Sequence, residues 1–174
     1  MSRHQPLSYS PVRPSQQLPV NVTLLKMATP GENMTPLQHA AQNRCFGCGP
    51  ANSGGLQLEF LLAEDGSVVS QANISDDFCG HPGYLHGGII ATLLDETMSK
   101  AVRASGISSM TRHMEVDYLL PVPSAKPLRM EGRVVRIEGR KRWTDARILD
   151  GEGKTLAHAK GLFVEVHPRA ANRP

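Results

Sequence analysis

The chain is poor in cysteine, weakly charged and without a long apolar run, and each of these features excludes a class of protein. Three cysteines in 174 residues are few and odd in number, so we expect no disulfide framework and a reducing, cytoplasmic setting. No apolar stretch approaches the roughly 18 residues that a membrane helix needs, and no signal-peptide pattern is present. We therefore expect no association with a membrane.

The charge and the size of the chain indicate an ordinary globular domain. The formal net charge of +3 is too small to indicate nucleic-acid binding by itself, so no nucleic-acid partner is expected. A hydrophobic content of 40 % is typical of a globular protein. A chain of 174 residues is long enough for one domain with a real core.

Residues 1–34 and 169–174 are predicted to be flexible tails that flank one domain at residues 35–168. The first tail has no acidic residue before Glu32 and is rich in proline, which prevents a continuous helix. Arg3, Arg13 and several serines leave a transit peptide open, although proline disfavours the amphipathic helix of such peptides. Whether Met27 or Met34 is the true first residue is left open too. The prolines of this segment are Pro6, Pro11, Pro14, Pro19 and Pro30.

In the first half of the domain, turn-forming residues separate one short predicted helix from two predicted strands. Thr35 followed by Pro36 resembles a helix cap with proline at the first helical position, which predicts a short helix to about Asn43. Alternating apolar and polar residues predict strands at 56–62 and 67–74, with a hairpin turn at 64–66. The glycine-rich stretch 45–55 is predicted to be a loop, and 78–84 a turn-rich segment.

From Gly87 to about residue 103, apolar residues recur at steps of three and four, which predicts a long helix. At about 100° per residue they span an arc of roughly 220°. That arc is too wide for a helix on a surface, so we expect a curved sheet to wrap it. Asp95 falls at the edge of the arc, whereas Glu96 is expected to face solvent. The apolar positions are Ile89, Ile90, Leu93, Leu94, Met98, Ala101 and Val102.

After residue 106 the chain has the pattern of strands alone. Strands are predicted at 111–120, 128–138, 141–149 and 155–166, with turns at 139–140 and 150–153. The short loops between these strands predict antiparallel pairing. Two strands, a long helix and four more strands indicate an α+β fold.

Three groups of residues resemble the hotdog-fold acyl-CoA thioesterases, in particular the phenylacetyl-CoA thioesterase type of the thioesterase superfamily. They are Cys45-Phe46-Gly47-Cys48-Gly49 through Gly55-Leu56, Pro82-Gly83-Tyr84-Leu85-His86-Gly87-Gly88 through Asp95, and 111–118 with Pro121 and Gly139-Arg140-Lys141. The resemblance covers about residues 45–166. It implies a hotdog fold, in which a curved antiparallel sheet of about five to six strands wraps a long central helix. It also implies hydrolysis of an acyl-CoA thioester to a free acid and coenzyme A.

The spacing of Gly87 and Asp95 predicts a dimer. Free N–H groups at a helix start can hold a carbonyl oxygen, and a carboxylate beside an apolar surface can act as a base or a nucleophile. Eight residues of helix separate the two groups by roughly 12 Å. They can act on one thioester only if they come from different copies of the helix, so a homodimer with two shared sites is expected. A homotetramer is left open.

The resemblance implies a role for each candidate catalytic residue. The Gly87 N–H binds the thioester oxygen as negative charge develops, and Asp95 acts as general base or as nucleophile. Thr111 occupies the position of a hydroxyl that holds the water. His86 fixes the turn or contacts the substrate carbonyl. Many relatives have Asn or Gln where Gly80 stands, so either His81 compensates or the site is looser.

The implied substrate brings coenzyme A, and no separate cofactor is expected. Arg140 and Lys141 are the predicted partners of its phosphates, although a merely solvated basic strand face is equally consistent. Gly88 and Ser99 are further candidate substrate-binding residues, and Ser99 is a second candidate for the hydroxyl that binds the water.

Two other functions are left open by the sequence. The first is a hotdog dehydratase or hydratase, which sets a histidine against an acid. His81-Pro82 has a weak similarity to the sequence signature of the dehydratases. The second is a protein that binds acyl-CoA without turnover.

Cys45 and Cys48 form a C-x-x-C pair. Zinc normally takes four ligands, and Cys79 and His81 could complete the set only if the fold brings them near. Because no second close pair exists, a tight loop with small buried thiols is favoured and no metal is expected. Tyr118 and Trp143 are predicted to fill the core or an interface.

Overall fold

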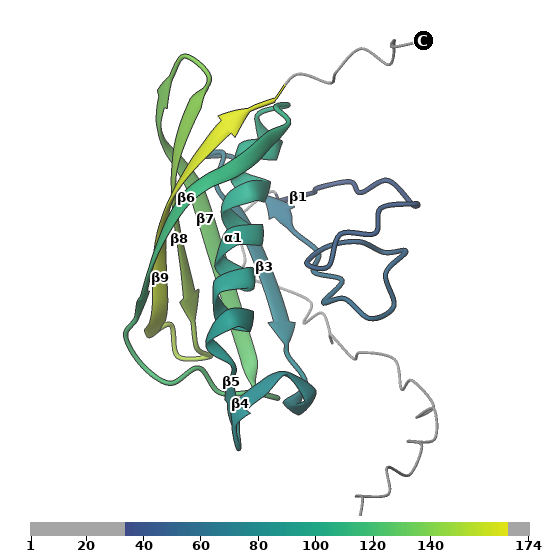
Figure 1. Ribbon diagram of the computed structural model, residues 1–174, viewed down its shortest axis with the longest axis vertical. Helices are drawn as coiled ribbons and strands as arrows, with labels where there is room; N and C mark the ends of the chain where they lie inside the picture. The colour runs from purple at the N-terminus through teal and green to yellow at the C-terminus, as the bar shows by residue number, and fades with distance from the viewer. Residues whose placement is uncertain (1–33, 167–174) are drawn as a thin grey trace, which may run out of the picture.

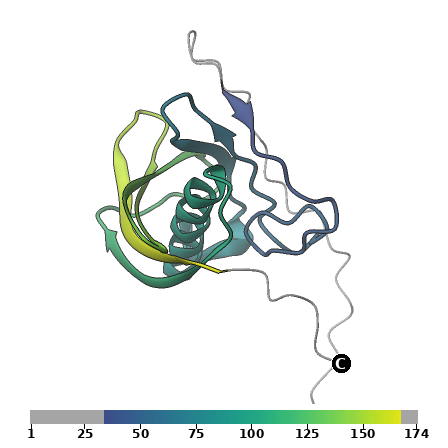
Figure 2. The same cartoon turned by 90° about the horizontal axis from the view of Figure 1, so that it is seen from above.

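One long helix, α1 (Gly87–Ala104), lies in the concave face of a curved antiparallel sheet. The computed structural model describes residues 34–166. Figure 2 looks along α1 and shows the sheet curving around the helix, with the segment before β2 on the other side. The expected arrangement of helix and sheet is therefore confirmed. The predicted tails, apart from Met34, lie outside the described residues, as do residues 167 and 168 of the predicted domain.

The main sheet has seven strands rather than the expected five to six. Its order is β1-β2-β3-β7-β8-β9-β6, and every neighbouring pair is antiparallel. The strands are β1 (Thr35–Pro36), β2 (Leu61–Leu62), β3 (Val68–Asn73), β6 (Ser109–Tyr118), β7 (Pro127–Glu138), β8 (Lys141–Leu149) and β9 (Thr155–Glu165). A short 3-10 helix, η1 (Asp76–Phe78), and a two-stranded sheet of β4 (Cys79–His81) and β5 (Tyr84–Leu85) lead into α1.

The helix predicted at residues 35–43 is wrong. Thr35 and Pro36 instead form β1, which pairs with β2 at the edge of the sheet. Proline lacks a backbone donor and is tolerated on an edge strand, so the same two residues that resembled a helix cap suit this position. The next residue, Leu37, continues the extended path by donating its N–H to the Phe60 carbonyl at 2.9 Å.

The strand predicted at 56–62 is shorter than expected, because only Leu61–Leu62 joins the sheet. The alternation of apolar and polar residues in this segment still predicts correctly which side chains are buried, because Leu56, Leu58 and Phe60 are all buried. Their segment pairs with the cysteine loop instead. The N–H of Leu56 donates to the Phe46 carbonyl at 2.7 Å, and that of Leu58 to the Gly47 carbonyl at 2.9 Å.

The four late strands are confirmed, but β6 does not pair with its neighbour in sequence. Residues 119–126 carry the chain away from β6, which lies next to β9 at the edge of the sheet, while β7 lies next to β3. The N–H groups of Leu119 and Leu120 both donate to the Leu156 carbonyl, so this crossing is fixed by backbone bonds. Thr111, on β6, is thereby brought beside α1.

The wide apolar arc of α1 is buried as predicted, at Ile90, Leu93, Leu94, Met98, Ala101 and Val102. Full burial of a side chain of this kind contributes about 1.5–3 kcal/mol. Glu96 corrects the prediction, because only 8 % of it is exposed. Among residues 34–166, no helix combines the length and apolarity needed to cross a bilayer.

Candidate active site

Asp95 and Thr111 meet between α1 and β6. The Thr111 hydroxyl donates a hydrogen bond to Asp95 Oδ1 at 2.8 Å. Asp95 lies in the middle of the helix at the edge of its apolar arc, and Thr111 lies near the start of the edge strand. These two candidate residues are therefore in contact, and the Thr111 hydroxyl, which was expected to hold the water, bonds to the carboxylate itself.

The surroundings of Asp95 favour a proton-accepting role. Its side chain is partly buried, and this burial raises its pKa above the ordinary value for aspartate. The Thr111 hydrogen bond opposes the shift, and the neighbouring Glu96 adds to it. A carboxylate whose charge is poorly solvated is a stronger base than one in water.

His86 caps the helix at its start. Its Nδ1 accepts the Gly88 N–H at 2.9 Å, so a neutral His86 ring carries its proton on Nε2. The Gly88 N–H is thus already bonded. The Gly87 N–H stands at the first helical position, where no intrahelical acceptor exists. Gly87 therefore offers the helix-start donor that the sequence predicts.

Tyr118 is a neighbour of Gly87 that the sequence did not assign to the site. Its hydroxyl donates to the Gly87 carbonyl at 3.2 Å. The residue is 54 % exposed, so of the two predicted places, core or interface, the core is excluded and the interface stays a prediction. A Cβ on Gly87 would stand 3.7 Å from the Tyr118 ring, which is ordinary contact. No local sequence signal relates Tyr118 to Gly87, because 31 positions separate them in the chain.

Gly80 stands against His86. A Cβ there would meet the His86 Cα at 3.0 Å and its Cδ2 at 3.2 Å. The side chain that many relatives carry at this position would therefore require His86 to shift. His81 is exposed, and its ring lies 6.3 Å from that of Tyr84.

The remaining substrate-side candidates lie elsewhere in the subunit. Ser99 follows Asp95 by one turn and lines a separate hollow of about 700 Å³ with Lys100 and Arg103. The Arg140 guanidinium donates to the Glu165 carbonyl at 2.7 Å. The β7–β8 turn that carries Arg140 and Lys141 lies at the opposite end of the subunit from the start of α1.

The side chains around Trp143 make this turn cationic. The Lys141 ammonium lies 5.9 Å from the Trp143 ring centroid, and the Arg136 guanidinium stacks on the same ring at 3.6 Å. Trp143 is partly exposed and packs against these cations, so its predicted place in the core is excluded and the interface alternative stays a prediction.

One subunit keeps Gly87 and Asp95 apart. Both residues belong to the same continuous helix, which separates them by roughly 12 Å along its axis. Thr111 and Tyr118 contact the acid and the donor from the two ends of β6. This strand therefore runs alongside the whole gap.

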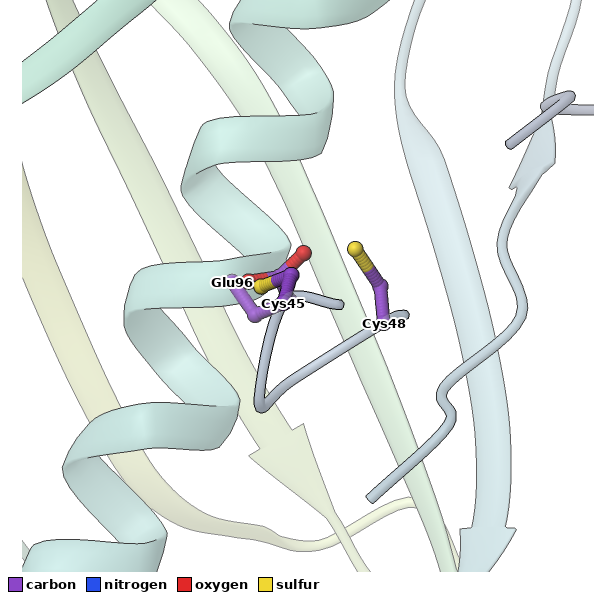
Figure 3. Close-up of side chains that lie close together, drawn as sticks. All are labelled: Cys45, Cys48 and Glu96. Carbon is purple, nitrogen blue, oxygen red and sulfur yellow. Dashed lines mark hydrogen bonds between the residues drawn. The ribbon is translucent and has the colours of Figure 1, made fainter. Parts of the chain in front are cut away.

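A second cluster joins Cys45, Cys48 and Glu96 on the other side of α1 (Figure 3). Cys79 does not belong to it, because its Sγ contacts the Ser124 hydroxyl at 3.2 Å. The alternative set with Cys79 and His81, which the sequence disfavoured, does not form, and Glu96 is the third member of the cluster instead. At about 100° per residue, Glu96 lies roughly 20° beyond Ile89, at the edge of the apolar arc opposite Asp95. That position was the signal for its burial.

Known proteins are similar to this chain in sequence and in fold. The family model of the thioesterase superfamily matches residues 82–157, which include the start of α1, Asp95 and Thr111. An acyl-coenzyme A thioesterase, THEM4 of Rattus norvegicus, is 36 % identical over 90 residues. These residues are 51 % of this chain and 39 % of the rat protein, so the chain spans well under half of that relative.

Two solved structures are similar as well. A crystal structure of a thioesterase superfamily protein is 30 % identical, with a TM-score of 0.66 over 71 % of this chain and 60 % of that one. An X-ray structure of a second protein from the thioesterase superfamily is 30 % identical, with a TM-score of 0.59 over 64 % of this chain and 86 % of that one.

Proposed function

Because this chain belongs to the thioesterase superfamily and has the hotdog fold, we propose that it hydrolyses an acyl-CoA thioester to a free acid and coenzyme A. The observation that carries the proposal is the Asp95–Thr111 hydrogen bond of 2.8 Å in a partly buried setting. The Gly87 N–H at the start of the same helix supplies the second element. The name of the rat relative supports the same substrate class.

The reaction needs two subunits. Asp95 and the Gly87 N–H cannot reach one carbonyl carbon and its oxygen across roughly 12 Å of helix, so each site combines Asp95 of one subunit with Gly87 of its partner. A twofold dimer then has two equivalent sites. A tetramer made of two such dimers leaves this arrangement unchanged.

The edge strand β6 offers a route to that dimer. Within residues 34–166 it is the last strand of the sheet and pairs on one side only, and Met110 and Tyr118 are exposed on it. Antiparallel pairing of two β6 edges about a twofold axis would bring the Thr111 end of one strand beside the Tyr118 end of the other. That places Asp95 near the helix start of the partner.

Each residue has a defined task in the proposed reaction. The Gly87 N–H, aided by the helix dipole, holds the thioester oxygen as negative charge develops on it. Asp95 either removes a proton from the attacking water or attacks the carbonyl carbon to form an anhydride that water then opens. Both routes consume one water and release the coenzyme A thiol. His86 fixes the helix start by its bond to the Gly88 N–H.

The cationic turn between β7 and β8 is the proposed binding region for the phosphates of coenzyme A. Arg140 and Lys141 are both exposed there, and Arg136 adds a third cation on the face of Trp143. Phosphate groups are bound well by such clusters of charge-assisted donors. Gly88, which has no side chain, leaves room for the thioester, and Ser99 is the proposed second water-binding hydroxyl.

A thiol-release assay tests the proposal. The full chain is assayed with short, medium, long and aryl acyl-CoAs, together with Asp95→Asn and a matched control, Glu152→Gln, in the exposed turn before β9. We expect release by the parent and the control, and a loss of at least 100-fold in Asp95→Asn. Equal rates in parent and Asp95→Asn would remove Asp95 from the mechanism. Hydration of an enoyl-CoA without thiol release would favour a hydratase.

A further inference from the structure

Three metal-binding side chains converge on the side of α1 away from Thr111. The Sγ atoms of Cys45 and Cys48 and a carboxylate oxygen of Glu96 all lie within 4.8 Å of one another. Figure 3 shows the two cysteines on one loop, against the helix that carries Glu96. The Cys45 thiol donates to Glu96 Oε2 at 3.5 Å. None of these residues has a part in the proposed hydrolysis.

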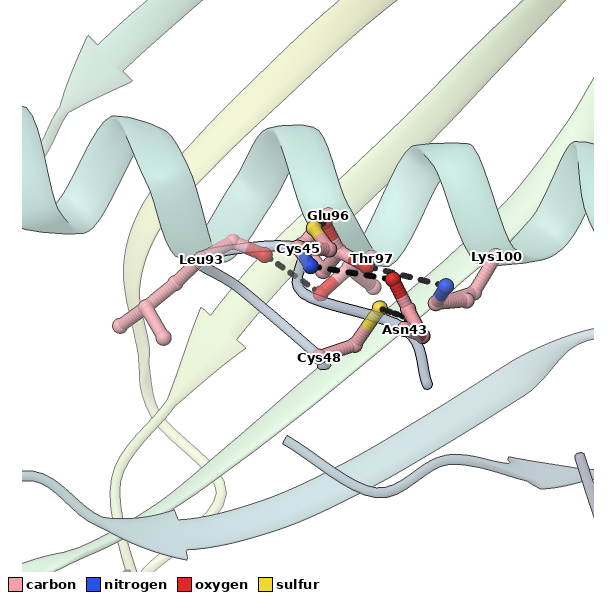
Figure 4. Close-up of polar contacts among 7 residues, drawn as sticks. All are labelled: Asn43, Cys45, Cys48, Leu93, Glu96, Thr97 and Lys100. Atoms are coloured by element: carbon pink, nitrogen blue, oxygen red, sulfur yellow. Dashed lines mark hydrogen bonds and ion pairs between the residues drawn. The ribbon is translucent and has the colours of Figure 1, made fainter. Parts of the chain in front are cut away.

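The loop is folded so that it presents both sulfur atoms. The Asn43 side chain accepts the Cys45 N–H at 3.0 Å and donates to the Cys48 sulfur at 3.5 Å (Figure 4). The Gly49 N–H donates to the Cys45 carbonyl at 2.9 Å. A Cβ on Gly49 would come within 2.5 Å of the Cys45 backbone nitrogen, so only glycine fits this turn.

Gly47 explains how the loop approaches the helix so closely. A Cβ on Gly47 would stand 2.6 Å from Glu96 Oε2, so any other residue would push the carboxylate away. The C-x-x-C spacing with a tight glycine turn is typical of half of a structural zinc site. The loop and the helix thus supply two thiols and one carboxylate at a single point.

A fourth donor has to come from outside these three converging side chains, and His39 is the candidate. Its Nε2 is buried and, within residues 34–166, has no hydrogen-bond partner, which is uncommon for a buried ring nitrogen. His39 and Cys48 line the same hollow of about 510 Å³.

Lys100 completes the charge balance around the cluster. Its ammonium lies 3.0 Å from Glu96 Oε1 and also contacts the Cys48 side chain. Two thiolates, one carboxylate and a divalent cation together carry a charge of about −1, which the ammonium neutralises. Hydrogen bonds to ligating groups of this kind form the outer shell of a metal site.

We propose that Cys45, Cys48, Glu96 and His39 bind one zinc ion, which fastens the cysteine loop to α1. Two sulfur donors, one imidazole and one carboxylate fill a tetrahedral shell and suit zinc better than magnesium or calcium. All four ligands come from the protein, so the site is structural and leaves no position for substrate. Coordination removes the thiol protons of Cys45 and Cys48.

Metal titration of the full chain tests the site. The chain is reduced, stripped with a chelator and titrated without oxygen, first with Co²⁺ and then with Zn²⁺. We expect one ion per chain, intense tetrahedral cobalt bands with sulfur-to-cobalt charge transfer, and displacement of cobalt by zinc. The chain should also melt at a higher temperature with zinc. Absence of cobalt bands in the reduced parent chain would overturn the proposal.

Four variants assign the ligands. Cys45→Ser and Cys48→Ala should each remove most of the charge-transfer band, and Glu96→Gln and His39→Ala should each weaken zinc binding at least tenfold. Cys79→Ser is the matched control and should bind as the parent does, because its sulfur contacts Ser124. A control that loses the band as fully as Cys48→Ala would contradict the site. Unchanged affinity in His39→Ala would remove that residue from it.

Counting the reactive thiols tests the site independently of the absorption bands of cobalt. In the reduced chain all three cysteines are free, and zinc should protect two of them from an alkylating reagent. Protection of Cys45 and Cys48 but not Cys79 supports the site. Equal reaction of all three with and without zinc, or a disulfide between Cys45 and Cys48 in the freshly isolated chain, would contradict it.

Discussion

Thr111 on β6 holds Asp95 on α1 through a hydrogen bond of 2.8 Å, although sixteen positions separate them in the chain. The bond joins the edge strand of the sheet to the middle of the helix that the sheet wraps. It fixes the direction of a carboxylate whose burial already raises its pKa. The Thr111 hydroxyl opposes this shift, so the pKa of Asp95 is lower than burial alone would make it.

Removing that hydroxyl should move the pH profile of the reaction. In Thr111→Val the carboxylate loses a donor, so the pKa of Asp95 rises further and the acid limb of kcat/KM moves to higher pH. At neutral pH we expect a fall of about tenfold. Thr111→Ser keeps the hydroxyl and should keep both the profile and most of the activity. Superimposable profiles for the valine and serine variants would exclude this role.

Removing the Gly87 N–H should abolish turnover and leave the fold intact. Proline fits the first helical position, and the backbone of His86 is already extended, as a residue before proline requires. Gly87→Pro should therefore melt near the parent temperature and lose about 10²–10³ in kcat. Gly87→Ala retains the donor, and its Cβ makes ordinary contact with Tyr118, so most activity should remain. Full activity in the proline variant would refute the donor role.

Asp95 should weaken the fold at neutral pH. Its folded pKa lies above the ordinary value, so the ionised form costs stability above that pKa, and the cost disappears as pH falls below the unfolded pKa. Asp95→Asn should therefore raise Tm by about 2–4 °C at pH 8 and by less at pH 4. Thermal unfolding at both pH values measures this. A rise in Tm of Asp95→Asn that is larger at pH 4 than at pH 8 would show that ionised Asp95 stabilises the fold, contrary to this prediction.

The cationic turn should contribute to KM rather than to kcat. Replacing Arg140 and Lys141 together by alanine should raise KM for acyl-CoA about five- to tenfold at low salt, with little change in kcat. An acyl-pantetheine substrate lacks the nucleotide phosphates and should show no difference between variant and parent. Lys154→Ala, in the exposed turn before β9, is the control. An equal rise in KM for both substrates would show that the turn does not bind phosphate.

Local patterns predicted most of the elements, because periodicity and turn residues act over a few positions. The recurrence of apolar residues at steps of three and four predicted α1, and the alternation of apolar and polar residues predicted β3 and the late strands. The first segment was wrong because Thr35-Pro36 suits both a helix cap and an edge strand, and only the pairing with β2 decides between them. The position of β6 beside β9 depends on a crossing that short-range patterns do not report.

The site was predicted in part for the same reason. His86, Gly87 and Asp95 are close in sequence, so helix geometry relates them directly. The family resemblance led us to expect that Thr111 holds the water, whereas in the structure its hydroxyl donates to Asp95. The burial of Glu96 was missed, because it depends on a loop some fifty residues earlier that supplies Cys45 and Gly47. A charged residue next to another acid is exposed unless distant partners cover it.

The claim that each site is shared between two subunits is tested most directly by mixing two inactive variants. Gly87→Pro and Asp95→Asn are coexpressed with different affinity tags, and the heterodimers are isolated. Each heterodimer contains one site with an intact Asp95 and an intact Gly87 N–H, so we expect about half of the parent activity per dimer. If both groups act within one subunit, the heterodimer will be as inactive as the two variants alone.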